Sequence, residues 1–435
     1  MNTPDRVAPR GDGTSNIRSW LVLTAVTAGF IVMALNWFSI AVAFTPMGDE
    51  LHVSTAQLTL LISVFLVGVG LCHVPAGLLA TRFGIRTAVV LGLTIESLSA
   101  VLTLWASDYS QMLVLRLLAG VGTSLFIPTG IAAVSVWFRR GYLAFALGIL
   151  SAGYSIGTTL GLYTWATLTE AIGWREAMAL GGALGLIVSL AIAAVYKAPQ
   201  GEEQLEGIKL TTAALRETLG NAQLWLYGLA FLGTYGAFFA ASQLFGDYCE
   251  NLRKLSSGQI GFAILVLGLA GIPGSLLGGW LSDRFARRKL FILAAIVMQG
   301  LALLALPVTP AGLLWLLGAA IGFAFNGGWA VWQSVPGCTR GVKSENIGTA
   351  VGLMLSITAI GGFLIPYVFG RILESSGYGW GWFFLGVVTL VCAIAGFVAR
   401  EPENPDTSEI GGDGPETSTH SAPDTTAYTS EAYRA

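Results

Sequence analysis

The stretch GLLATRFGIR, residues 77–86, returns 202 residues later as GWLSDRFARR, residues 279–288. The opening glycine, the Arg-Phe pair and the closing arginine are the same in both copies, and each copy follows a long apolar run. A fainter echo joins LGILSAGYSIG at 147–157 to VGLMLSITAIG at 351–361. Similar turns at matching places predict a chain built from two related halves.

The composition is that of a membrane protein. Of the 435 residues, 54% are hydrophobic and only 11% are charged, and the mean hydropathy is +0.70. A soluble domain carries roughly 25% charged residues, so this chain cannot cover a surface that faces water. The net charge of −2 and the lack of a basic patch give no reason to expect a nucleic-acid partner. The four cysteines are scattered without metal spacing, so we expect neither a disulfide framework nor a bound metal.

A membrane-spanning helix needs about 20 apolar residues, and this criterion predicts twelve of them. We expect an all-α integral membrane protein with two six-helix halves. The predicted spans lie near 20–44, 57–79, 87–106, 111–137, 143–168, 175–196, 223–246, 258–281, 289–307, 311–335, 347–373 and 380–399.

These spans and the polar stretches between them predict the organisation of the chain. The tail is acidic, rich in Ser, Thr and Pro and short of large aliphatic residues, which is typical of disorder. The predicted parts are a cytoplasmic N-terminal segment (1–19), an N-terminal half (20–196), a cytoplasmic linker (197–222), a C-terminal half (223–399) and a disordered cytoplasmic tail (400–435).

The orientation follows from the positions of Lys and Arg, which concentrate on the cytoplasmic side of membrane proteins. If the N-terminus is inside, 18 of the 23 Lys and Arg residues lie inside, four lie outside, and Arg116 lies within a span. Both termini are therefore predicted to be cytoplasmic. The polar stretch before the first span is too long for a cleaved signal peptide, so we expect a multi-pass protein of the plasma (inner) membrane.

The two repeated turns resemble a signature of the major facilitator superfamily, G-x-x-x-D-R/K-x-G-R/K-R/K, which follows the second span and recurs more weakly after the eighth. The resemblance covers about residues 18–400. It implies the fold of that superfamily, and it implies that the motif latches helix ends together in one access state; alternatively, the basic residues only anchor the loops inside. The first copy has Thr81 in place of Asp, and the second has Ala286 in place of Gly. The residues that match the latch are Gly77, Arg82, Arg86, Gly279, Asp283, Arg284 and Arg288.

A second motif of the superfamily, R-x-x-x-G-x-G, is matched in the fourth span by Arg116, Gly120 and Gly122. The following VSVWFRRGYLAFALG, residues 134–148, is similar to the loop found in nitrate/nitrite, cyanate and oxalate/formate-type branches. The fifth span lacks the proline motif of drug–proton antiporters, which counts against that class.

Ionisable side chains at membrane depth are functional candidates, and the N-terminal half holds three: His73, Glu96 and Arg116. His73 precedes Val-Pro in a run that resembles one in nitrate/nitrite porters, where an arginine contacts the anion; the resemblance implies that His73 faces the central cavity. The second arginine of those porters corresponds to Ser275 here. The replacement of these two arginines by His73 and Ser275 argues against nitrate as the substrate. It favours a weaker or organic anion, or a role of His73 in proton coupling, since imidazole titrates near physiological pH. The alternative is a neutral His73 bonded to a backbone carbonyl.

Glu96 is predicted either to accept the coupling proton or to form a structural ion pair with His73 or Arg116. For Arg116, the resemblance implies a role in proton coupling, and a structural role is the alternative. Weaker candidates for substrate contact are polar or aromatic residues on helices that line the cavity of the superfamily: Asn36, Trp37, Tyr154, Tyr235, Asn326 and Trp329.

Together these features predict a secondary active transporter that rocks two halves about a mid-membrane site. We expect a small organic anion of the monocarboxylate type as substrate and protons as the coupling ion. The alternatives are an exporter of amphipathic compounds and a non-transporting membrane sensor. No phosphate-binding loop or nucleophile–base pair is present in the sequence, so we expect no enzyme activity and no cofactor. The other expected partner is the lipid bilayer, and we expect a monomer.

Overall fold

The computed structural model describes residues 17–53, 55–138, 142–197, 212–343 and 346–402. The regular elements among these residues are all helical. The α-helices are α1 (Ile17–Val42), α2 (Phe44–Leu51), α3 (Thr55–Leu71), α4 (His73–Phe83), α5 (Ile85–Val101), α6 (Tyr109–Trp137), α7 (Leu143–Thr159), α8 (Trp165–Ile172), α9 (Trp174–Val195), α10 (Thr212–Leu219), α11 (Ala222–Asp247), α12 (Ser257–Leu269), α13 (Gly271–Phe285), α14 (Arg288–Ala305), α15 (Leu314–Gln333) and α16 (Ile347–Val398).

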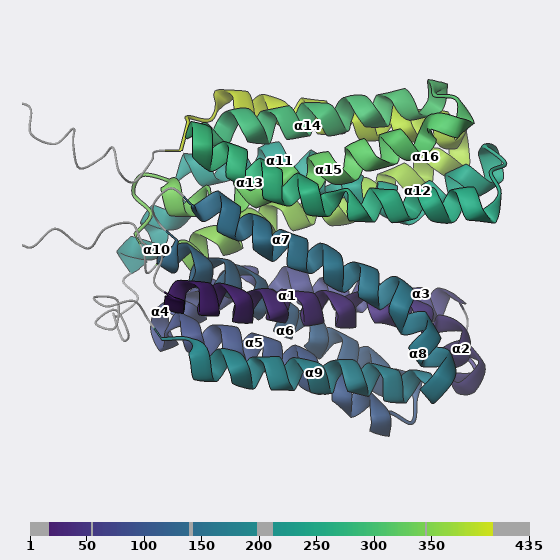
Figure 1. Cartoon of the computed structure of the whole chain (residues 1–435), viewed down its shortest axis with the longest axis horizontal. Helices are drawn as coiled ribbons and strands as arrows, with labels where there is room; N and C mark the ends of the chain where they lie inside the picture. The colour runs from purple at the N-terminus through teal and green to yellow at the C-terminus, as the bar shows by residue number, and fades with distance from the viewer. Residues whose placement is uncertain (1–16, 54, 139–141, 198–211, 344–345, 403–435) are drawn as a thin grey trace, which may run out of the picture.

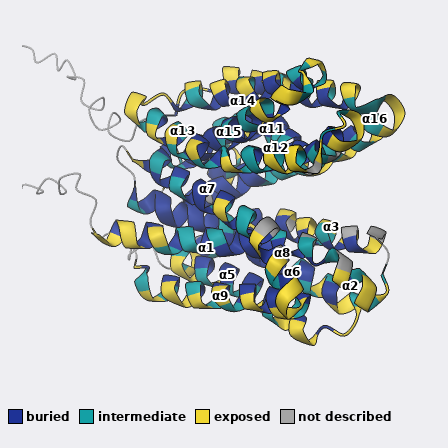
Figure 2. Cartoon of the chain, turned by 45° about the vertical axis from the view of Figure 1, so that its right-hand side comes forward, coloured by how far each residue is buried: buried dark blue, intermediate teal, exposed yellow. Residues whose placement is uncertain are grey.

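The helices form two bundles that lie side by side with their long axes roughly parallel (Figure 1). One bundle contains α1 to α9 and the other contains α11 to α16, as the two-half prediction requires. Buried residues concentrate inside and between the bundles, and much of the outer surface is exposed (Figure 2). Large apolar side chains such as Leu190 and Phe363 are more than two-thirds exposed, at 71% and 68%. Such a surface suits lipid as the surrounding solvent.

The number of spans is less sharply defined than the fold. Nine helices of the described residues are long and apolar enough to cross a membrane, and a tenth results if α3 and α4, bent by 41°, count as one span. The predicted eleventh and twelfth spans both lie in α16, which breaks at Gly377, where φ is 80°. The predicted fifth span is divided among α7, a π-helical turn at Leu160–Thr164 and α8. The count of twelve, like the orientation, stays a prediction. The N-terminal segment, most of the linker and most of the tail lie outside the described residues.

The internal repeat is visible in how the helices pack within each half. In the N-terminal half, Gly120 of α6 lies against the carbonyl group of Phe65 in α3. In the C-terminal half, Gly322 of α15 lies against the carbonyl group of Leu267 in α12. Both residues of the second pair follow those of the first by 202 positions, the offset that separates the repeated turns. Small residues allow such close approach of membrane helices.

The halves meet most closely at the end that carries Arg82 and Arg284, here called the basic end. There α4 packs on α16, and α13 packs on α7. Gly77 of α4 lies against the backbone of Thr349, and Gly279 of α13 lies against the backbone of Ala144. A Cβ atom at either glycine would meet main-chain atoms of the facing helix, which cannot move aside as a flexible side chain can.

A second pair of glycines makes the reciprocal contacts about one helical turn deeper. Gly148 of α7 lies against the carbonyl group of Ser275, and Gly352 of α16 lies against the carbonyl group of His73. The first contact joins α7 to α13 and the second joins α16 to α4. In each contact a glycine of one half packs against the backbone of the other half. The basic end is therefore closed by main-chain packing that follows the two-fold repeat.

A buried acidic residue adds a polar tie to this closure. The Oδ2 atom of Asp283 in α13 accepts a hydrogen bond of 2.8 Å from the backbone N–H of Phe145, in the first turn of α7. Its Oδ1 atom accepts one of 3.2 Å from Nη2 of the almost fully buried Arg288. Free N–H groups at a helix N-terminus favour a carboxylate, so Asp283 stabilises the contact between the halves.

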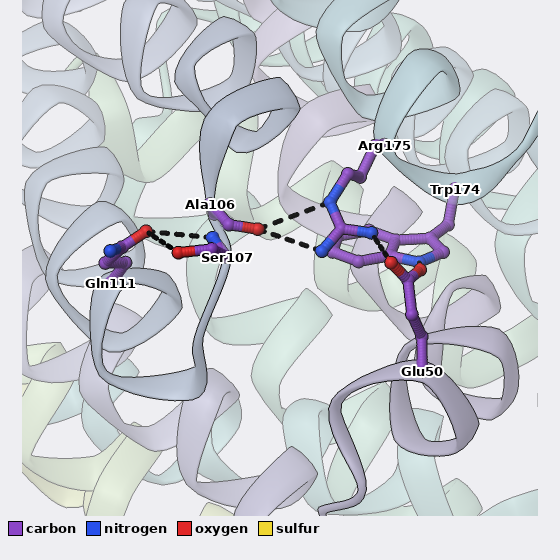
Figure 3. Close-up of polar contacts among 6 residues, drawn as sticks. All are labelled: Glu50, Ala106, Ser107, Gln111, Trp174 and Arg175. Atoms are coloured by element: carbon purple, nitrogen blue, oxygen red, sulfur yellow. Dashed lines mark hydrogen bonds and ion pairs between the residues drawn. The ribbon is translucent and has the colours of Figure 1, made fainter.

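The opposite end of the N-terminal half is held by a second polar cluster (Figure 3). Glu50 of α2 forms an ion pair with Arg175, and it accepts a hydrogen bond of 2.7 Å from the indole N–H of Trp174. The guanidinium of Arg175 also donates to the carbonyl oxygen of Ala106 at 2.9 Å and lies over the Trp174 ring. One arginine thus ties the segments that connect three pairs of helices, which stiffens this half.

Filling the deep glycine contacts is expected to open the basic end. Gly148→Ala and Gly352→Ala each place a methyl group against a carbonyl, and overpacking costs about 1–3 kcal/mol, so the closed population should fall about tenfold relative to the open one. Distances between spin labels at Phe83 and Phe285, in a background without the native cysteines, report the change. Gly261→Ala is the control, because a Cβ atom there meets nothing within 4 Å. Equal distance distributions in all variants would contradict the closure by glycines.

The Glu50 cluster is expected to stabilise the protein in a pH-dependent way. The hydrogen bond from Arg175, followed by that from Trp174, holds the pKa of the Glu50 carboxyl below its ordinary value. A carboxyl with a depressed pKa stabilises the fold at neutral pH and loses that effect as the pH falls through its titration range. Glu50→Gln should therefore lower the Tm in detergent by roughly 1–2 °C at pH 7 and by less near pH 3. Glu374→Gln, in an exposed pair, is the control; a Tm difference that does not depend on pH would contradict the account.

Candidate functional site

A cavity of about 430 Å³ lies between the two halves. On α7 its lining residues follow Gly148, and on α12 they precede Ser275, so the cavity lies beyond the glycine contacts, away from the basic end. Among the described residues that line it, none carries a charge. They are Trp37, Phe38, Ile40, Ile62, Leu66, Tyr154, Ser155, Thr158, Thr159, Phe238, Phe239, Ser242, Ile264, Leu265, Leu267, Gly268 and Asn326.

Aromatic rings form facing walls of this central cavity. From the N-terminal half, Trp37 and Phe38 stack with 5.6 Å between ring centroids, and Tyr154 meets both edge-on at 6.2 and 6.1 Å. From the C-terminal half, Phe238 stacks on Phe325 with 3.8 Å between centroids and 3° between planes. Rings held by other rings in this way form a wall whose shape is set before any ligand binds.

The polar groups of the cavity are hydroxyls and one amide, and most are already engaged. Thr158 and Thr159 donate to carbonyl oxygens one turn back on α7, at 3.0 and 2.9 Å, and Ser242 donates to the carbonyl of Phe239. The Ser155 hydroxyl of α7 donates to the carbonyl oxygen of Ser151 at 3.2 Å and also lies 3.4 Å from Oδ1 of Asn326 on α15, a contact between the two halves at the cavity wall. The Asn326 amide, with one hydrogen bond to a carbonyl of its own helix, keeps a second N–H for a ligand.

A second, much smaller cavity of about 10 Å³ lies within the N-terminal half. Its lining includes Glu96 of α5, Arg116 of α6 and Asn36 of α1, all buried. Asn36 donates to Oε2 of Glu96 at 3.4 Å, and Ser97 donates to the same atom at 3.1 Å. No ion pair links Glu96 with Arg116 among the described residues. The volume is about that which holds one water molecule.

The sequence brings these groups together through small residues. Gly122 of α6 lies against the backbone of Glu96, which lets α6 approach α5 closely. The Asn36 amide also donates to the carbonyl of Gly181 on α9 at 3.3 Å, so Asn36 is fixed between α5 and α9. The next residue of α1 is Trp37, which lines the central cavity. Two adjacent residues of α1 therefore connect the sites: Asn36 contacts Glu96, and Trp37 lines the central cavity.

His73 lies elsewhere than the sequence analysis expects. It is 3% exposed, begins α4 after the break at Cys72, and has its carbonyl against Gly352; it does not line the central cavity. The physical reason is helix geometry. Leu66 is the last residue before His73 that lines the cavity, and the seven positions from Leu66 to His73 advance the chain about two turns toward the basic end. Neither ring nitrogen has a hydrogen-bond partner in the described part of the chain, so the bond to a backbone carbonyl that was the alternative is not made either.

The remaining candidates divide into two groups. Tyr154 and Asn326 line the central cavity. Tyr235 and Trp329, whose rings lie 5.5 Å apart, pack behind the wall against Phe325. The sequence analysis did not identify three phenylalanines that line the central cavity: Phe38, Phe238 and Phe239. A phenylalanine in an apolar span carries no signal of its own, although the pair at 238–239 sits one helical turn beyond Tyr235.

The motif residues at the basic end also differ in their surroundings. Arg82 and Arg284 are exposed, whereas Arg288 is buried against Asp283. Arg86 donates to the carbonyl of Ala193 on α9, within its own half. Ala286 has φ 52°, and Gly84 in the first copy has φ 84°, which explains why the motif has glycine at this position. The latch role of these residues, Gly77 and Gly279 included, stays a proposal.

No group of three or more His, Cys, Asp and Glu side chains that could hold a metal ion occurs among the described residues. The four cysteines lie within the described ranges and are unpaired.

Comparisons with known proteins agree with this architecture. The chain is 27% identical over 417 residues to a probable nitrate/nitrite antiporter, NarK1, from Thermus thermophilus, covering 86% of this chain and 89% of the relative. It is 24% identical over 381 residues to a probable sulfoacetate transporter, SauU, from Cupriavidus necator, covering 82% and 88%. A solved structure of the proton:xylose symporter XylE superposes with a TM-score of 0.74 at 14% identity, covering 90% of this chain and 98% of the symporter.

The family model described as Major Facilitator Superfamily matches residues 26–335 and 250–427. The match spans both halves and agrees with the repeated turns, the helical architecture and the central cavity. The predictions of fold and of a multi-pass inner-membrane protein are thereby confirmed. The chain belongs to the Major Facilitator Superfamily and is a transporter of small solutes.

Proposed function

We propose that the chain is a proton-coupled secondary transporter of a small organic anion of the monocarboxylate type. The observation that carries the proposal is the separation of charge from the central cavity. The wall of that cavity is neutral, while Glu96 and Arg116 share a closed pocket beside the same helix, α1. The named relatives support an anionic substrate, since nitrate, nitrite and sulfoacetate are anions.

The two charges suggest how a proton and an anion bind together. When Glu96 is ionised, its charge offsets that of Arg116. When Glu96 takes a proton, the charge of Arg116 is left uncompensated in a medium of low dielectric, where it acts over a longer range than in water. An anion in the central cavity would then lie in a positive potential, with Asn36 and Trp37 forming the path between the two sites. Binding of the proton thus favours binding of the anion, and the reverse holds by linkage.

His73 is proposed as a second participant, at the interface rather than in the cavity. Its backbone carbonyl contacts Gly352 of α16, and this contact must part when the basic end opens. In the proposed mechanism its two buried, unpartnered ring nitrogens gain access to water at that step. Such a group couples opening of this end to hydration of a buried polar side chain. Asp283, Arg288 and the other motif residues are proposed to hold the same end closed, and the chain is proposed to work as a monomer.

A second candidate function, export of amphipathic compounds, is favoured by the uncharged aromatic wall of the central cavity. The two functions differ in the substrate that the cavity accepts. An exporter of this kind would exchange hydrophobic cations or neutral compounds and would ignore small anions.

Transport by purified protein in liposomes tests the proposal. Pyruvate, phenylpyruvate, gluconate and nitrate, with a hydrophobic cation for comparison, are supplied with and without an inward proton gradient. At least one carboxylate should accumulate only with the gradient. Glu96→Gln should abolish accumulation but keep counterflow, the exchange of labelled for unlabelled substrate, because it removes a titrating group and keeps the shape.

The controls are Glu217→Gln, an exposed carboxylate on α10, and His73→Gln. Glu217→Gln should accumulate substrate like the wild type. Loss of accumulation in His73→Gln and its retention in Glu96→Gln would move the proton site to His73 and contradict the assignment to Glu96. Exchange of the cation without exchange of any anion would refute the proposed function and favour the exporter.

A further inference from the structure

We propose that the substrate is a monocarboxylate with a flat aromatic body, which the central cavity holds between the rings of its two halves. The inference rests on the proposed function and narrows it from small organic anions to one chemical class. It differs from the inorganic anions and the small sulfonated acid that the named relatives are said to carry.

The walls carry the first part of the argument. Trp37, Phe38 and Tyr154 stand on one side of the cavity, and Phe238 and Phe239 stand on the other. A ring that enters between them can stack on one wall and meet the other edge-on, arrangements that aromatic pairs prefer. The stack of Phe238 on Phe325, itself backed by Trp329, fixes that wall in place. Little side-chain entropy is therefore lost on binding.

The hydroxyl groups carry the second part. Thr158, Thr159 and Ser242 already donate their hydrogens to carbonyls of their own helices, so they offer few donors to a ligand. A polyhydroxy acid would place many hydroxyls against aromatic and aliphatic side chains, and each unpaired polar group is costly. Nitrate would leave most of a cavity of 430 Å³ without contact.

The polar end of the ligand has one defined place. The Ser155–Asn326 pair joins the halves at the cavity wall, and the Asn326 amide keeps an N–H that can donate to a carboxylate oxygen. A ligand with a single carboxylate can accept a hydrogen bond from the Asn326 amide while its apolar body packs between the aromatic rings. A second charged group on the body would have no partner among the described lining residues.

Competition binding tests the inference with ligands that share one head group. Phenylpyruvate and pyruvate differ by the aromatic ring alone, and gluconate and nitrate represent the other classes. Radiolabelled phenylpyruvate is bound to purified full-length protein in detergent, and the other three compete. Pyruvate should bind at least about tenfold more weakly than phenylpyruvate, because a single methylene in a hydrophobic pocket already contributes a factor of about 10–200. Gluconate and nitrate should compete more weakly still.

Variants of each wall complete the test. Phe238→Leu and Phe38→Leu should each weaken phenylpyruvate binding about tenfold and leave pyruvate binding unchanged. Phe363→Leu, on an exposed surface of α16, should change neither. Two variants from opposite walls are used so that misfolding of one does not end the test. The comparison of phenylpyruvate with pyruvate on the wild-type protein does not depend on any variant.

The inference is overturned if pyruvate binds as tightly as phenylpyruvate, if gluconate binds more tightly, or if the wall variants weaken both ligands equally. In each of these cases the proposed function survives, provided that a carboxylate still accumulates with the proton gradient in liposomes. If none of the four anions binds or exchanges, the proposed function fails together with the inference.

Discussion

The structure depends on how closely two backbones can approach at the basic end. Gly77, Gly148, Gly279 and Gly352 place main chain against main chain at four points between the halves. Backbone contacts of this kind need no rearrangement of large side chains at these four points when the halves part. The contacts lie between the basic end and the central cavity. Two of these glycines, Gly77 and Gly279, belong to the repeated turns, so the motif supplies two of the four contacts at this end.

The distribution of charge is the second constraint. Membrane burial of an ionisable group is costly, yet the N-terminal half holds Glu96 and Arg116 in a pocket of its own. The central cavity is left neutral and aromatic. In the proposed mechanism the proton site at Glu96 of α5 and the substrate site in the central cavity do not overlap, so both can be occupied together, as symport requires. Asn36 and Trp37, neighbours on α1, connect the two sites and form the route of the proposed coupling.

Much of this could be predicted from the sequence, and the failures have physical causes. The repeat and the apolar runs specify the fold because lipid burial leaves the chain few alternatives. Glu96 and Arg116 were identifiable because charge at membrane depth is rare. His73 was expected in the cavity, but rotation and depth along α3 and α4 depend on packing, which the sequence does not display. The phenylalanines of the wall resemble every other apolar residue of a span, and only their position distinguishes them.

The central claim is that an anion binds in the neutral cavity together with a proton on Glu96. The most direct test is proton uptake by detergent-purified protein in weak buffer, followed with a pH indicator while phenylpyruvate is added. The account predicts that each molecule bound takes up a proton in the wild type, and that Glu96→Gln binds the ligand with no uptake. Binding to the wild type without proton uptake, or equal uptake by both proteins, would contradict it.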